Sequence, residues 1–166
     1  MPSAFESVLK NKNMAYRPLG SAPAGQAPIR VAFVLMDNFS MMSFTGAVDA
    51  LVTANLMSDM PLYKVLTVGV SGGQVTSDLG IVISTDIELA QMPENQDVLI
   101  VAGGFRVKLQ GHPLLRRKLR ANAASGAILG GLWNGAFFVA DANLLDGFEC
   151  AVHPESRAMM AEVFPM

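Results

Sequence analysis

Residues 128–140 form the stretch of this chain that is best suited to chemistry, because a polar corner there interrupts two apolar runs. The corner places Trp133 and Asn134 between glycines, a pattern that predicts a buried strand turning sharply into a helix. In α/β enzymes such a corner commonly holds a Ser or Cys nucleophile beside backbone N–H groups that can stabilise an oxyanion. An indole and an amide cannot attack a carbonyl carbon, so we expect no acyl transfer by this route.

Further candidate residues follow the apolar runs at 30–36 and 97–101, and one more, His153, stands at the start of the last predicted helix. In a parallel sheet the carboxyl ends of the strands meet at one edge, where ligands bind. We therefore expect one crevice there, with a small-molecule ligand and without a metal or cofactor. Its candidate ligand-binding residues are Asp37, Ser40, Gly103, Gly104, Phe105, Trp133, Asn134 and His153.

Each candidate at the corner has a structural alternative. Trp133 either forms a wall of a ligand pocket, where its face would hold a cation, or fills the crevice as a core aromatic. Asn134 either orients a ligand or tolerates strained backbone at the turn. Gly103 and Gly104 either offer N–H groups to a carboxylate or end a strand compactly.

The remaining candidates also have both a functional and a structural interpretation. Asp37 suits a cationic ligand, yet Asp-Asn after a strand is first a turn signal. His153 is either a ligand-binding imidazole or a cap before Pro154. His112 and Cys150 show no metal-ligand spacing, so the sequence predicts no metal site.

Strands alternate with helices along the chain, which predicts an α/β fold with a doubly wound, mostly parallel sheet of the flavodoxin-like kind. Buried strands are expected at 30–36, 63–69, 97–101 and 127–132, with a short one at 148–152. A small hairpin is expected from 75–77 and 81–84. Helices are expected from Phe44, capped by Ser43 or Thr45, and over 113–126, 135–142 and from 153 onward.

Composition narrows the function classes. The 166 residues are 51% hydrophobic and 16% charged, which favours buried strands and a homodimer interface. A net charge of -2 and the lack of a dense basic block argue against a chain that binds nucleic acid by itself. The basic residues of 116–120 are better explained as the solvated face of a helix. A single cysteine and the absence of a long apolar run favour a cytoplasmic protein without a membrane span. Residues 1–28, rich in Pro and Gly, predict an irregular N-terminal arm before a domain of residues 29–166.

The order of several short motifs is similar to that of the class I glutamine amidotransferase-like (PfpI-type) domain. The motifs are Val-Ala-Phe-Val-Leu at 31–35, Asp97 to Gly104, Gly131 to Phe137, Leu-Leu-Asp-Gly at 144–147 and Val152-His153 before a helix. More narrowly, the chain resembles the amino-terminal sensor half of AraC-type transcriptional regulators. This resemblance implies a glutamine amidotransferase-like fold and DNA contact through a C-terminal helix-turn-helix domain that the chain does not contain. This branch includes regulators that respond to arginine, carnitine or glycine betaine.

Departures from the family pattern point away from catalysis. Trp133 stands where the family's enzymes carry the elbow cysteine, and Ser40 falls where they carry a supporting Glu. The resemblance therefore implies a pseudoenzyme: a non-catalytic effector-sensing and dimerisation domain that binds a small amino-acid-like or betaine-like metabolite. The alternative is a stand-alone PfpI-type hydrolase with another nucleophile, Cys150 or Ser40. A third possibility is a dimerisation module whose crevice Trp133 occludes.

Overall fold

The structure, a computed structural model, describes residues 12–15 and 27–164 and is built on a five-stranded parallel sheet. The strands lie in the order β5-β2-β1-β6-β7, so the chain reverses direction across the sheet between β1 and β6. Their bounds are β1 Ile29–Leu35, β2 Tyr63–Gly69, β5 Ile87–Glu88, β6 Val98–Ala102 and β7 Ile128–Leu132. The predicted α/β fold and its four main strands are confirmed; the two-residue β5 was not predicted because it is too short to carry a pattern.

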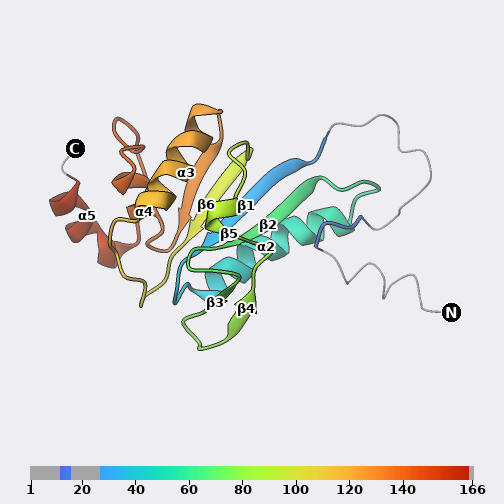
Figure 1. The fold of residues 1–166 in the computed structure, drawn as a ribbon, viewed down its shortest axis with the longest axis horizontal. Helices are drawn as coiled ribbons and strands as arrows, with labels where there is room; N and C mark the ends of the chain where they lie inside the picture. Colours follow the sequence, from blue (N-terminus) through green and yellow to red (C-terminus); the bar gives the residue numbers. More distant parts are fainter. Residues whose placement is uncertain (1–11, 16–26, 165–166) are drawn as a thin grey trace.

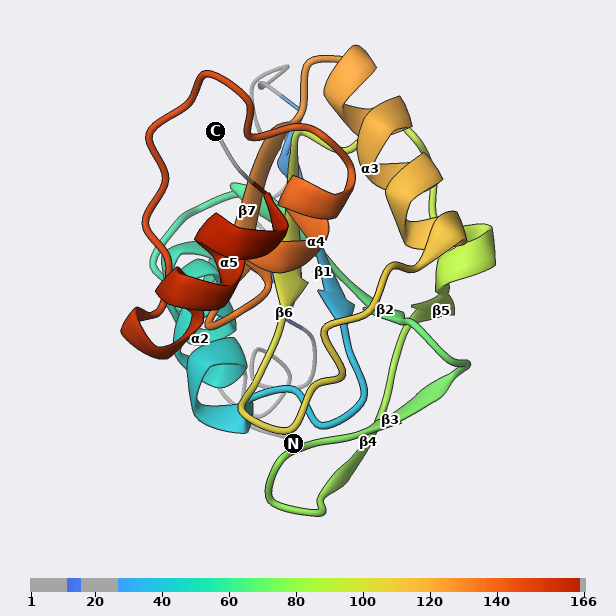
Figure 2. The same ribbon diagram turned by 90° about the vertical axis from the view of Figure 1, so that its left-hand side faces the viewer.

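Both faces of the sheet are buried, which explains the continuous apolar runs. Along β1, Ala32 and Val34 enter one hydrophobic cluster while Phe33 and Leu35 enter the other, because successive side chains of a strand point to opposite faces. Helix α2 (Met41–Leu56) covers one face. Helices α3 (Pro113–Ala124), α4 (Ala136–Asp141) and α5 (Arg157–Val163) lie on the other side, as Figures 1 and 2 show.

The start of helix α2 differs from the prediction. Helix α2 begins at Met41 and is capped by Ser40, whose Oγ accepts a hydrogen bond from the Ser43 N–H at 3.4 Å. The prediction of Ser43 or Thr45 as the cap is wrong, because the helix starts one turn earlier and the Thr45 hydroxyl donates back to the Met41 carbonyl. Helix α3 starts where predicted, with His112 as its cap.

The β3–β4 hairpin is confirmed, but it forms a separate two-stranded sheet. Strands β3 (Gln74–Thr76) and β4 (Val82–Ser84) pair antiparallel, and a single bridge between Phe39 and Ser77 joins this hairpin to the loop after β1. The strand predicted at 148–152 is wrong: these residues form an irregular segment without regular hydrogen bonds, followed by a 3-10 turn, η2 (Pro154–Ser156), that leads into α5. A second 3-10 turn, η1 (Leu89–Gln91), precedes β6.

Two predictions about exposed segments need correction. Most of the predicted arm 1–28 lies outside the described residues, but residues 12–15 are packed: Asn13 exchanges hydrogen bonds with the Val65 backbone, and Lys12 pairs with Asp86 at 2.9 Å. In α3, Lys118 does not belong to the solvated face. Its side chain is buried, and its Nζ donates to the Met92 carbonyl at 2.6 Å and contacts Glu94.

Candidate functional site

The corner after β7 is a strained elbow, and the strained residue is Trp133. Its φ of 59° lies in the left-handed region, which costs a bulky residue roughly 1–2 kcal/mol. The flanking glycines are required by close backbone contacts: a Cβ on Gly131 would overlap the Ala136 backbone, and one on Gly135 would overlap the Val101 carbonyl. The elbow is therefore held by packing of the strand end against the start of α4.

Asn134 joins the elbow to the end of β6. Its amide is buried, with Oδ1 accepting from the Gly104 N–H at 2.9 Å and Nδ2 donating to the Gly104 carbonyl at 3.0 Å. The oxygen and the nitrogen of the Asn134 amide are thus both hydrogen-bonded to the backbone of one residue, Gly104. The expectation that Asn134 absorbs the backbone strain is wrong, because the positive φ belongs to Trp133.

The two glycines after β6 are buried and their N–H groups are engaged. The Gly103 N–H donates to the Leu132 carbonyl at 3.1 Å, and its carbonyl accepts from the Ser40 N–H at 2.8 Å. The Gly104 N–H is bound by Asn134. The prediction that these N–H groups face outward and bind a ligand carboxylate is therefore wrong. Both glycines serve instead to end the strand compactly.

The two side chains considered as substitute nucleophiles lack an activating base among the residues that the structure describes. Ser40 is buried and its Oγ is used in the α2 cap, where it bonds the Ser43 N–H and hydroxyl. Cys150 is exposed on the irregular segment after α4, with no hydrogen-bond partner in the described part of the chain. Neither arrangement resembles the nucleophile–base pair that covalent catalysis requires.

Three of the predicted residues do come together, as an aromatic cluster of Phe105, Trp133 and His153. The Trp133 and His153 rings stack at 4.0 Å with 11° between their planes, and Phe105 meets Trp133 edge-on at 6.1 Å and 77°. Phe105 is 73% exposed and the indole is half-buried. His153 also caps η2, since its Nδ1 accepts from the Glu155 N–H at 3.4 Å.

Asp37 lies elsewhere, so the single crevice predicted from the sequence is divided. Its carboxylate accepts a hydrogen bond from the Ser71 hydroxyl at 2.6 Å and lines a cavity of about 310 Å³ beyond β1 and β2. A larger cavity, of about 630 Å³, runs along the outer side of β7 between Gly130 and the segment around Phe148. That cavity is lined mainly by small and apolar residues, and the elbow side chain is not among them.

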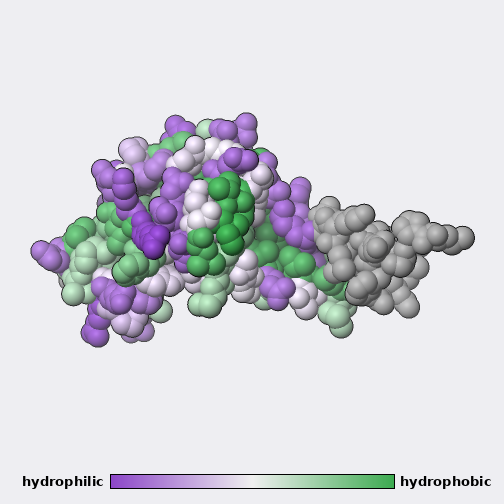
Figure 3. Space-filling model, turned by 90° about the horizontal axis from the view of Figure 1, so that it is seen from below, coloured by the Kyte–Doolittle hydropathy of each residue, from purple (hydrophilic) through white to green (hydrophobic). Residues whose placement is uncertain are grey.

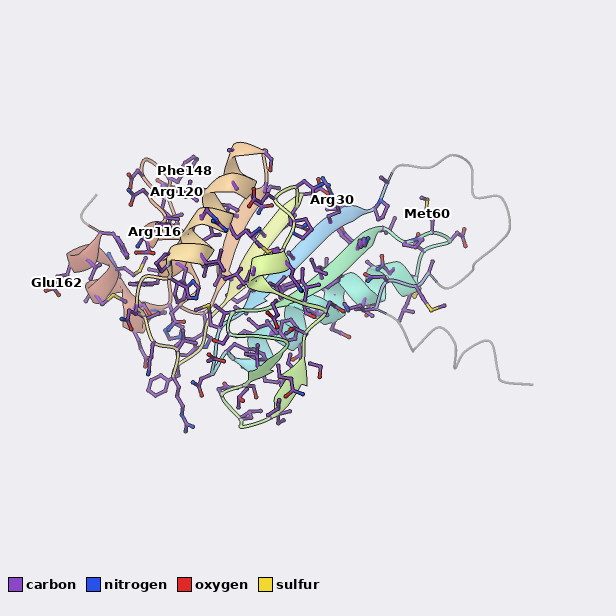
Figure 4. The ribbon with its side chains drawn as sticks, viewed as in Figure 1. Arg30, Met60, Arg116, Arg120, Phe148 and Glu162 are labelled. Carbon is purple, nitrogen blue, oxygen red and sulfur yellow. The ribbon has the colours of Figure 1, made fainter. Side chains whose placement is uncertain are left out.

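Two ion pairs link neighbouring elements of the fold. Hydrogen bonds from the Arg30 guanidinium, with its charge, lower the pKa of Asp97 to about 2 and clamp the starts of β1 and β6. Arg116 on α3 pairs with Asp141 on α4 at 2.8 Å, and the hydrogen bonds to this carboxylate raise the pKa of Arg116. Figure 4 shows Arg116 on α3, on the same helix as Arg120.

Within residues 12–15 and 27–164, no three His, Cys, Asp or Glu side chains gather in a way that would hold a metal ion. In the same residues no helix combines the length and the apolar character needed to cross a membrane.

Comparison with known proteins gives a family and a set of regulators. The model of the DJ-1/PfpI family matches residues 29–163. The HTH-type transcriptional regulator GbdR of Pseudomonas aeruginosa is 36% identical over 150 residues, which are 90% of this chain and 40% of that protein. The HTH-type transcriptional regulator GlxA of Rhizobium meliloti is 32% identical over 82% of this chain and 42% of its own length. The chain thus spans about two fifths of the curated regulators that it matches.

Two solved structures are similar to this chain, one of a regulator and one of a thiJ/pfpI family protein. An AraC family transcriptional regulator from Pseudomonas putida superposes with a TM-score of 0.74 at 44% identity, covering 83% of this chain and 74% of that one. A thiJ/pfpI family protein from Bacillus anthracis, at 18% identity, has a TM-score of 0.68 over 85% of this chain and 66% of its own; it supports the fold alone.

Proposed function

We propose a sensing role from the premise that this chain belongs to the DJ-1/PfpI family, whose model spans most of it. In this proposal residues 29–166 are the non-catalytic effector-sensing and dimerisation domain of a cytoplasmic AraC-type transcriptional regulator. The relatives named as regulators support the assignment. The observation that carries it is Trp133, which occupies the strained elbow of the fold with an aromatic ring in place of a nucleophile.

The effector in this proposal is a small amino-acid-like or betaine-like metabolite that binds at the aromatic cluster. His153 covers one face of the indole, while Phe105 stands nearly perpendicular to it and remains exposed. Two rings at right angles form two walls of the kind that surround ammonium groups through cation–π attraction. The negative ring faces favour a quaternary ammonium or guanidinium group, whose charge is spread and weakly hydrated.

The site carries its own reporter, because Trp133 is the only tryptophan in the chain. Titration with glycine betaine, carnitine and arginine should give a saturable change in indole emission for at least one of them. Phe105→Ala should weaken that binding several-fold, as expected for removal of one cation–π wall. Phe148→Ala is the matched control, since Phe148 is also exposed (68%) but lies outside the cluster, on the segment after α4 (Figure 4). A flat emission signal with all three compounds, or equal effects of the two variants, would contradict the proposed site.

Dimerisation in this proposal uses the β3–β4 hairpin. Leu79, Ile81 and Val82 are 68%, 51% and 55% exposed there, and Figure 3, which views the side on which the hairpin projects, shows hydrophobic side chains gathered near the centre of the surface. An exposed apolar group of this kind favours contact with a second copy. Ile81→Asp should shift the purified protein from dimer to monomer in analytical ultracentrifugation, whereas Ile128→Asp, at 69% exposure on β7, should not. A dimer that survives Ile81→Asp would exclude this surface.

DNA would be contacted by a helix-turn-helix region outside these 166 residues. Effector binding would then shift the arrangement of the dimer or of the two domains, and so the affinity for DNA.

A further inference from the structure

The cavity beyond β1 and β2 has the construction of a second ligand site. Its volume of about 310 Å³ is at the lower end of the range for small-molecule sites, roughly 300–1,000 Å³. It is a half-open cavity bordered by the ends of two strands and by the segment between β6 and α3, which Figure 2 shows turning below the end of β1. It shares none of its lining with the aromatic cluster.

The floor of the cavity is apolar and its rim is polar. Met36 and Val107, both 7% exposed, and the half-buried Val70 form the apolar part. The rim carries a carboxylate, an ammonium group, a hydroxyl, an amide and an imidazole. These rim residues are Asp37, Ser71, Lys108, Gln110 and His112.

The charged groups of the rim keep capacity for a ligand. One oxygen of Asp37 is held by the Ser71 hydroxyl, which orients the carboxylate and leaves the second oxygen free to accept. The side-chain ammonium group of Lys108 forms no ion pair or hydrogen bond with the described residues, in contrast to the charged groups of Lys118 and Arg116; its backbone carbonyl accepts from the Gln110 N–H. His112 uses only Nδ1 in the α3 cap, so its Nε2 keeps its own hydrogen-bonding capacity.

The lining is fixed before any ligand arrives. The Val70 N–H donates to the Leu35 carbonyl at 3.2 Å, and the Val107 N–H donates to the Gly104 carbonyl at 3.0 Å. Asn38, next to Asp37, has a positive φ of 65° and donates from its N–H to the Thr76 carbonyl. A preformed lining of this kind loses little entropy on binding.

We propose that this cavity binds a small zwitterionic metabolite, with an ammonium group at one end of a short aliphatic chain and a carboxylate at the other. Asp37 receives the ammonium group, Lys108 receives the carboxylate, and the methylene groups lie on Met36, Val70 and Val107. The site is distinct from the aromatic cluster, so the inference does not rest on the proposed effector or its binding residues.

Matched probes test the charge pattern. Isothermal titration calorimetry of the whole chain would use the ω-amino acids glycine, β-alanine, γ-aminobutyrate and 6-aminohexanoate, which differ in the span between their charges. Succinate and 1,4-diaminobutane serve as four-carbon controls with two like charges. At least one ω-amino acid should bind saturably, and both controls should bind at least about tenfold more weakly, since each places a like charge against Asp37 or Lys108.

A charge-reversal variant then tests whether Lys108 binds the carboxylate of the ligand. Lys108→Glu should weaken the zwitterion by roughly tenfold or more and improve 1,4-diaminobutane, whereas Arg117→Glu, an equal change of charge at an exposed position of α3 outside the lining, should leave both unchanged. Trp133→Ala should abolish the response at the aromatic cluster and leave this binding intact, which separates the two proposals. Failure of all four ω-amino acids to bind, or equal effects of Lys108→Glu and Arg117→Glu, would overturn the inference.

Discussion

The amide of Asn134 is the best place to test the account of the elbow, because it is the bridge between two strand ends. Asn134→Ala removes both hydrogen bonds to Gly104 and leaves the buried Gly104 N–H without a partner, while the Gly104 carbonyl keeps its hydrogen bond from the Val107 N–H. A net hydrogen bond contributes about 1 kcal/mol, and each buried group left unsatisfied costs about 1–3 kcal/mol. Allowing for water that enters the space left by the amide, we expect a loss of about 2–4 kcal/mol in the free energy of unfolding.

A loss of that size is a large share of the roughly 5–15 kcal/mol that stabilises a typical domain. Urea unfolding followed by circular dichroism and by Trp133 emission would measure it. Asn95→Ala is the control, since Asn95 is exposed in the loop before β6 and should change stability by no more than about 0.5 kcal/mol.

Asn134→Asp sharpens the test through pH. The ionised carboxylate can accept from the Gly104 N–H but repels the Gly104 carbonyl, so burial there raises the pKa of the new carboxyl above its unfolded value of about 3.9. The protonated form reproduces both hydrogen bonds. The deficit relative to the wild type should therefore be small below about pH 4 and should grow as pH rises through the raised folded pKa. A loss near zero for Asn134→Ala, or a deficit for Asn134→Asp that is the same at every pH, would refute the bridging role.

Two further predictions concern the elbow and the ion pair at the strand starts. Trp133→Gly should be more stable than Trp133→Ala by up to about 1 kcal/mol in urea unfolding, because both remove the indole but only Ala keeps the cost of a left-handed φ; equal stabilities would argue against strain at this position. The Arg30 guanidinium holds the pKa of Asp97 at about 2, below its usual 3.8, so this pair should add stability above about pH 4 that is lost as pH falls toward 2. Arg30→Gln should remove that part of the acid dependence, and an unchanged profile between pH 5 and 2 would contradict it.

The elements of the fold were predictable because their signals are local. Apolar runs as long as β1 and β2 report strands buried on both faces, and Pro113 and Gly126 mark the limits of one helix region. The short strand predicted at 148–152 failed because an apolar run without a partner strand does not form a ladder. The cap at Ser40 was missed because Met41 and Met42 give no periodic signal before Phe44.

The site was predictable as a set of residues but not as an arrangement. Strand order places Phe105, Trp133 and His153 at one edge, and they do meet there. The sequence does not show which backbone N–H groups already donate hydrogen bonds within the chain. That knowledge is needed to tell whether Gly103 and Gly104 can bind a ligand. Lys108 was missed altogether, because a lone lysine in a loop carries no pattern; only the cavity that it lines draws attention to it.

The elbow also shows how this scaffold can keep its shape without a nucleophile. Gly131 and Gly135 are fixed by contacts with backbone atoms, and Asn134 is fixed by its two bonds to Gly104. None of these constraints involves the side chain of residue 133, which contacts only the rings of Phe105 and His153 among the aromatic residues described. The backbone of the elbow and the chemistry that it presents are therefore separable. A cysteine and a tryptophan can occupy the same strained position at similar backbone cost, and the side chain alone decides whether the corner attacks a substrate or offers it a surface.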